Sequence, residues 1–148
     1  MTRQRGFGAI AAIVVLVILA ALAGAIVSIS TTQQITSAQD VMSARAWQAA
    51  RAGNEWGLYQ ALKGSWTSCT TGTNQPLDLT ADTGFHVNVT CDSWLYNEGE
   101  STPGTPQTVR VYRIKAVACT ATPCPASGAL VAGVGYIERT RVVLATDR

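Results

Sequence analysis

The chain has 148 residues, with 11 Lys or Arg against 9 Asp or Glu, and charged residues make up only 14% of it. Arg3 and Arg5 precede a long apolar run; removing these two from 11 leaves 9 basic residues, which balance the 9 acidic ones. Such a chain has no global field to attract nucleic acid or acidic substrates, so neither is expected as a partner. The length beyond the apolar run allows one modest domain.

The apolar run extends from Phe7 to Val27 without a charged or strongly polar side chain. A helix over these residues is roughly 30 Å long, enough to cross the core of a bilayer. Arg3 and Arg5 favour a cytoplasmic N-terminus, which places the rest of the chain on the other side of the membrane. A cleavable secretory signal is the alternative, since small residues recur at the end of the run, at Ala21, Ala23 and Ala25.

The helical pattern continues beyond the apolar run without a Pro or a turn cluster. Apolar or small residues recur in steps of three or four: Ile35, Ala38, Met42, Ala46, Ala49, Gly53, Trp56 and Tyr59. Polar residues, Asn54 among them, fill much of the rest, which is typical of an amphipathic helix. We therefore predict one long helix that ends near Gly64, with a narrow stripe of small residues packed on a domain.

The remainder predicts three strands of an antiparallel meander: Phe85–Cys91, Val109–Cys119 and Val134–Ala145. Ser65–Thr83 reads as an irregular loop, and Asn97–Thr108 as a polar connection rich in Gly and Pro. A bulge is expected in the last two strands, whose alternation is imperfect. A long helix followed by a small antiparallel sheet is an α+β pattern, with the sheet covering the helix stripe.

Four cysteines follow the apolar run, which in an exported domain indicates two disulfides with three pairings open. Cys119 and Cys124 flank a short turn and can close it locally. Cys91 then points inward at the end of its strand, where it can reach Cys69. We expect the pairs Cys69–Cys91 and Cys119–Cys124. Zinc at Cys119 and Cys124 is the alternative, but the sequence offers no further ligands for it.

The residues Arg5, Gly6 and Phe7 before the apolar run resemble the signal of type IV pilins and type II secretion pseudopilins. The resemblance implies that prepilin peptidase cuts between Gly6 and Phe7 and methylates Phe7. It divides the chain into a leader (1–6), a transmembrane half-helix (7–30) and an amphipathic half-helix with a pilin-like β domain outside the cytoplasm (31–148). It also implies residence in the bacterial inner membrane and then in a pilus.

The helix resembles more closely the minor pilins of the PilX and MshP type, which include the MSHA pilus biogenesis proteins. The matching residues are Ala46, Ala49, Ala50, Ala52, Gly53, Glu55 and Trp56. Shaft-forming pilins carry a Glu at the fifth position of the mature helix, where this chain has Ala11. The resemblance thus implies a minor pilin that primes or caps the fibre tip, with other minor and major pilin subunits as partners.

No catalytic set can be assembled, so we expect no enzyme, cofactor or metal site. The only histidine, His86, falls on the outward face of a strand. A candidate partner patch lies on the two strands expected to pair: Arg110, Arg113, Lys115, Arg139 and Arg141. Three other functions stay open: a minor pseudopilin of a type II secretion system, a tip adhesin or DNA-binding pilin, and a simple membrane anchor.

Overall fold

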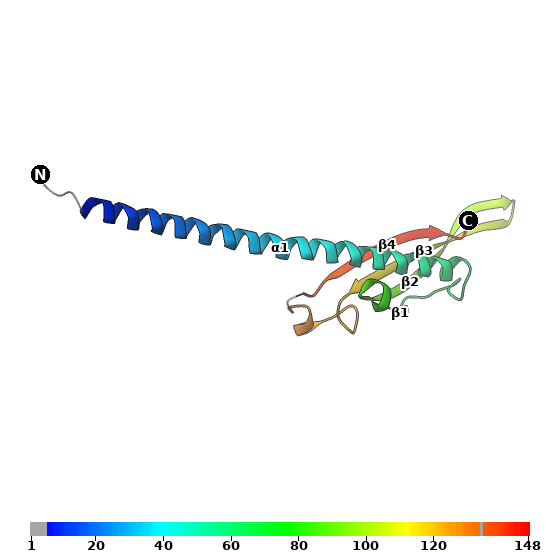
Figure 1. Cartoon of the computed structure of the whole chain (residues 1–148). Helices are drawn as coiled ribbons and strands as arrows, with labels where there is room; N and C mark the ends of the chain where they lie inside the picture. The colour runs from blue at the N-terminus through cyan, green and yellow to red at the C-terminus, as the bar shows by residue number, and fades with distance from the viewer. Residues whose placement is uncertain (1–5, 134) are drawn as a thin grey trace, which may run out of the picture. The chain divides into compact units, whose positions relative to one another are not determined.

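The structure is a computed structural model that describes residues 6–133 and 135–148 (Figure 1). It has an α+β fold in which a long N-terminal helix, α1 (Gly6–Leu62), precedes a four-stranded antiparallel sheet. The chain forms two compact units, residues 1–40 and 41–148, which are described separately. Arg3 and Arg5 lie outside the described residues.

The described part of the first unit is helical throughout, from Gly6 to Asp40. Leu, Ile, Val and Ala dominate its apolar run, and no Pro interrupts it. Among the described residues, α1 is the one helix long and apolar enough to cross a membrane.

The second unit contains the end of α1 and the sheet. The strands follow one another in space as they do in sequence: β1 (Thr73–Leu79), β2 (Phe85–Thr102), β3 (Thr105–Cys119) and β4 (Glu138–Thr146). One helical turn, α2 (Thr80–Thr83), joins β1 to β2, and a 3-10 turn over Gly128–Leu130 precedes β4. This meander confirms the antiparallel architecture expected from the sequence.

The core lies between one face of the sheet and the second-unit part of α1. The helix contributes small residues that are fully buried: Ala46, Ala49, Ala50 and Ala61. Every second residue of the first half of β2 faces them, as the strand period requires: Phe85, Val87, Val89 and Cys91. Ala46, Ala49 and Gly53 of the predicted stripe are therefore buried. Ala38 is exposed, and Ile35 and Tyr59, which were also placed on the stripe, are 56% and 62% exposed.

The first strand, β1, lies inside the segment predicted to be an irregular loop. Its sequence is polar and contains Pro76, which removes a backbone N–H donor. Such a strand is stable at the edge of a sheet, where only one side of its backbone is paired, and β1 pairs with β2 alone. The polar composition of β1 is typical of a loop, so the sequence did not predict this strand.

The polar connection predicted over Asn97–Thr108 is also strand. The ladder of β2 and β3 continues to Thr102 and Thr105, and the turn is confined to Pro103 and Gly104. The register shifts of the sheet lie in this hairpin, between Asn97 and Gly99 and between Glu100 and Thr102, whereas β3 and β4 pair in one continuous register. The bulge expected in the last two strands was thus misplaced.

Two disulfides join Cys69 to Cys91 and Cys119 to Cys124, the pairs expected from the sequence. Cys69 belongs to the segment after α1, so its disulfide holds this segment to β2. The Tyr112 hydroxyl donates a hydrogen bond of 2.7 Å to the Thr67 carbonyl, and Trp66 packs edge-on against Trp56 with ring centroids 5.0 Å apart. Together these contacts hold the segment that follows α1 against the sheet.

Candidate assembly surfaces

The first candidate surface is the apolar segment of α1. All its large aliphatic side chains from Ile10 to Val27 are at least half exposed, and Leu16 and Val17 are 65% and 62% exposed. Exposing a side chain of this kind to water costs about 1.5–3 kcal/mol relative to burying it. Summed over the segment, this cost exceeds the roughly 5–15 kcal/mol by which a typical domain is stable. The segment therefore needs an apolar environment that the described chain does not supply.

The second unit brings α1 unusually close to the sheet at two glycines. A Cβ atom at Gly53 would lie 2.6 Å from Val87 Cγ1, and one at Gly57 would lie 2.6 Å from Ile114 Cγ2. Real Cβ atoms do not approach carbon this closely, so only glycine permits the observed packing. The pair is one helical turn apart and therefore lies on the same face.

Asn54 lies beside these glycines, although its sequence context placed it among the polar residues of the exposed face. It is 1% exposed, and neither its amide nitrogen nor its carbonyl oxygen has a hydrogen-bond partner within the described part of the chain. An unsatisfied buried amide costs about 1–3 kcal/mol. Periodicity alone could have placed position 54 near the buried stripe, since it lies four residues after Ala50.

The five basic residues of the candidate patch do not form one surface. The strand period turns Arg113 and Lys115 to the face opposite α1, whereas Arg110 shares the helix-facing side with Tyr112. Arg113 forms an ion pair of 2.6 Å with Asp92 and lies 5.2 Å over the Trp94 ring. Arg110 donates to Ser93 Oγ at 3.2 Å.

The last two arginines of the patch, Arg139 and Arg141, contact α1. Arg139 donates a hydrogen bond of 2.8 Å to Ser43 Oγ, and Arg141 lies 4.5 Å over the ring of Trp47. Both contacts involve neutral groups, and no described carboxylate lies within ion-pair distance of either guanidinium. The two cations are held in place but not neutralised.

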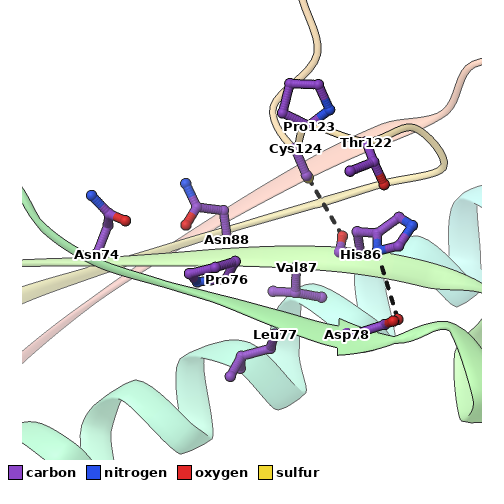
Figure 2. A pocket seen from close by; sticks show the side chains of 10 residues that line it. All are labelled: Asn74, Pro76, Leu77, Asp78, His86, Val87, Asn88, Thr122, Pro123 and Cys124. Atoms are coloured by element: carbon purple, nitrogen blue, oxygen red, sulfur yellow. Dashed lines mark hydrogen bonds and ion pairs between the residues drawn. The ribbon is translucent and has the colours of Figure 1, made fainter.

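His86 lies on the outward face of β2, as expected, at the side of a pocket of about 480 Å³ (Figure 2). Its Nδ1 atom lies 3.6 Å from Asp78 of β1, and the loop closed by the Cys119–Cys124 disulfide forms the opposite wall with Thr122 and Pro123. The pocket has mainly apolar walls, and no described group of His, Cys, Asp and Glu residues could hold a metal ion.

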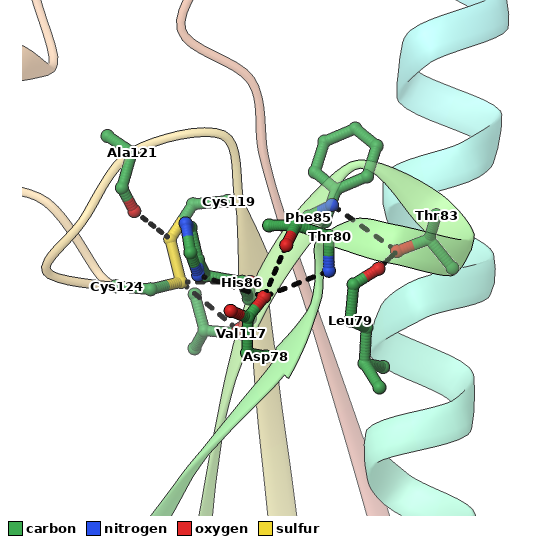
Figure 3. A network of polar contacts seen from close by, with 10 residues as sticks. All are labelled: Asp78, Leu79, Thr80, Thr83, Phe85, His86, Val117, Cys119, Ala121 and Cys124. Carbon is green, nitrogen blue, oxygen red and sulfur yellow. Dashed lines mark hydrogen bonds and ion pairs between the residues drawn. A yellow bond between two sulfur atoms is a disulfide. The ribbon is translucent and has the colours of Figure 1, made fainter.

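Asp78 belongs to a network of polar contacts at the turn between β1 and β2 (Figure 3). Its carboxylate accepts hydrogen bonds from Thr80 Oγ1 at 2.6 Å and from the Thr80 backbone N–H at 3.0 Å. These bonds, with a smaller contribution from His86, lower the pKa of Asp78 below its usual 3.8. The hydrogen bonds of Asp78 stabilise the turn between β1 and β2, so we assign this site a structural role.

A further exposed surface lies on the far half of the β2–β3 hairpin. The pairing with β1 ends at Cys91 and that with β4 at Val111, so residues 95–110 form a two-stranded ribbon that extends beyond the sheet (Figure 1). Trp94, Leu95 and Tyr96 at its base are 39%, 58% and 53% exposed. The sequence did not reveal this surface, because most of the ribbon is rich in Gly and Pro and was predicted to be a loop.

The sequence matches no protein-family model, and no curated protein or solved structure shows significant similarity to it.

Proposed function

We propose that this protein is a minor pilin, a subunit that is held in the bacterial inner membrane by α1 and then joins a type IV pilus of the MSHA type. The observation that carries the proposal is that one helix has two different surfaces. Its first part exposes apolar side chains on every side, and its last part presents a stripe of small residues covered by a disulfide-bonded sheet.

Each surface suits one step of assembly. In the membrane, lipid would cover the exposed segment, as the hydrophobic effect requires. In a fibre, helices of other minor and major pilin subunits would replace the lipid, and the sheet would give neighbour specificity. The residues Arg5, Gly6 and Phe7 support this reading through their resemblance to a prepilin peptidase site.

The place of the subunit is proposed to be the fibre tip. A carboxylate at position 11 would be costly in the bilayer unless another group compensated it. In shaft pilins the family's account supplies that group as the N-terminal amine of a neighbouring subunit. A subunit that primes or caps the fibre has no such neighbouring amine to pair with. The uncharged Ala11 at this position agrees with that place in the fibre.

The mature N-terminus tests the membrane and processing steps. The full chain is expressed in bacterial membranes with and without prepilin peptidase, and its intact mass and N-terminal peptide are measured. We expect loss of residues 1–6 and a methyl group on Phe7 only with the peptidase. Gly6→Val should block processing, whereas Gly8→Ala, the matched control two residues on, should not. Cleavage after the small residues near Ala25 would instead show a secretory signal, and an intact N-terminus would show a simple anchor.

The tip assignment has its own test. Ala11→Glu introduces the carboxylate typical of shaft subunits, and the number of fibres and the position of the labelled subunit are compared with those of Ala11→Gln. We expect the acidic variant to impair fibre initiation or to move the subunit into the shaft. Unchanged fibre number and unchanged tip location would contradict the tip role while leaving membrane processing intact.

A further inference from the structure

The outer edge of the sheet at β4 presents unpaired backbone groups. Ile137 O accepts from Thr120 N at 3.1 Å, and Asp147 N donates to Arg110 O at 3.2 Å, so odd-numbered residues of this strand direct their backbone toward β3. The even-numbered residues Thr140, Val142 and Leu144 therefore direct their N–H and C=O groups away from β3. Since β4 is the last strand of the sheet, no described strand pairs with this side (Figure 1).

The two edges of the sheet differ in how well they are protected. At the opposite edge, β1 carries Pro76 and Asp78, and a proline or a charge is a common device against pairing with another chain. From Val142 to Thr146, β4 has neither a proline nor a charged residue. Over Val142–Thr146 the β4 edge is therefore less protected against an added strand than the β1 edge is.

The side chains along β4 define what that strand should contain. Val142 and Leu144, on the face away from α1, are 51% and 69% exposed. On the other face, Arg139 and Arg141 are held by the Ser43 hydroxyl and the Trp47 ring, and described carboxylates neutralise neither of them. A strand with apolar residues on one face and carboxylates on the other would complement both sets.

A second copy of this chain fits the edge poorly. Within β4 the one carboxylate, Glu138, lies on the face away from α1, so a second β4 strand would place no carboxylate opposite Arg139 and Arg141. This mismatch favours a different protein, with acidic residues, as the partner.

We propose that the free edge of β4 binds an extended strand of another protein by β-augmentation. The strand has apolar residues opposite Val142 and Leu144 and carboxylates opposite Arg139 and Arg141. Its backbone bonds to Thr140, Val142 and Leu144 would give affinity, and the two guanidinium groups would select acidic sequences. This surface is separate from the apolar segment of α1, so the proposal does not depend on the type of fibre.

The test uses the full chain in lipid nanodiscs and a short fluorescent peptide. The peptide has valines opposite Val142 and Leu144 and glutamates opposite Arg139 and Arg141, and binding is measured by fluorescence anisotropy. Leu144→Pro removes an outward N–H without removing a bond to β3, and we expect it to weaken binding by about tenfold. Leu144→Thr keeps the N–H and should retain more of the affinity.

Charge selection is tested with matched variants. Arg139→Gln combined with Arg141→Gln should abolish the preference for glutamate over lysine in the peptide. Lys115→Gln, on the opposite face of the sheet, should leave that preference unchanged. In the unmodified chain, hydrogen exchange at the amides of Val142 and Leu144 should slow when the peptide is added. This measurement does not depend on whether any variant folds.

Three results would overturn the proposal. One is unchanged exchange at Val142 and Leu144 with the peptide bound, which would place the peptide elsewhere. Another is equal affinity for the glutamate and lysine peptides. The third is self-association of the chain in nanodiscs that Leu144→Pro abolishes, which would make a second copy the occupant.

Discussion

Gly53 of α1 lies against Val87 of β2 so closely that a Cβ atom at position 53 would be 2.6 Å from Val87 Cγ1. The same atom would lie 3.1 Å from the Cβ atom of Ala116, so a side chain at position 53 would meet both β2 and β3. The absence of one methyl group thus sets the distance between helix and sheet.

Gly53→Ala should therefore lower the free energy of unfolding, although alanine is the better helix former by about 1 kcal/mol. Overpacking of this kind costs about 1–3 kcal/mol, and the short, branched Val87 side chain cannot move aside as a long flexible one could. Urea unfolding of the full chain in detergent, followed by tryptophan fluorescence, measures the change. Gly24→Ala is the control, because nothing lies within 4 Å of its Cβ position. Equal stability of the two variants would contradict the close packing.

Asn54→Leu should stabilise the second unit by about 1 kcal/mol, because it removes a buried amide that has no hydrogen-bond partner in the described chain. Leucine is also the better helix former. Asn54→Asp provides the opposite case, since it buries a charge and should destabilise strongly. Both are compared in the same urea experiment. A marked loss of stability in Asn54→Leu would show that the amide has a partner or that the site cannot hold the larger side chain.

The two disulfides should contribute unequally. Cys69 and Cys91 are 22 residues apart, whereas Cys119 and Cys124 are only 5 apart. The loop-entropy relation gives about 3 kcal/mol for the first and about 2 kcal/mol for the second. Replacing each pair by alanine and measuring unfolding tests the order. The first replacement should also loosen the segment after α1, which is measurable as faster hydrogen exchange around Trp66. The reverse order of stability would contradict this account.

Asp78 should make the second unit sensitive to acid. The folded-state pKa of Asp78 is lowered below 3.8, chiefly by the Thr80 hydroxyl and backbone N–H. Its contribution is therefore complete above about pH 3.8 and is lost as the pH falls through the lower folded-state value. Asp78→Asn should flatten this part of the curve of unfolding free energy against pH. Asp82→Asn, in the following helical turn, is the matched control and should keep the acid-dependent loss. Parallel curves for the native chain and Asp78→Asn would exclude the role of this carboxylate.

Local patterns in the sequence were enough to predict the main elements. An uninterrupted apolar run followed by small residues at helical spacing indicated one helix with two surfaces, and the alternation from Phe85 to Cys91 indicated a half-buried strand. Both signals are local, because the periods of helix and strand act on neighbouring residues. The cysteine pairs were also expected, since strand direction and a short turn limit which thiols can meet.

Only the tertiary structure could place β1, the ribbon of β2 and β3, and the arginines. The polar strand β1 and the Gly-rich ribbon exist because a neighbouring strand satisfies their backbone, which composition does not record. The basic residues lie on two paired strands, yet strand alternation and the contacts of Arg139 and Arg141 with α1 divide them between two faces. The sequence by itself determined the long helix, the inner parts of β2, β3 and β4, and that the chain has an apolar helix long enough to span a membrane. Packing between segments distant in the chain decided which residues share a surface. The reason is that residues become neighbours through strand register and helix–sheet contacts, which spacing along the sequence does not fix.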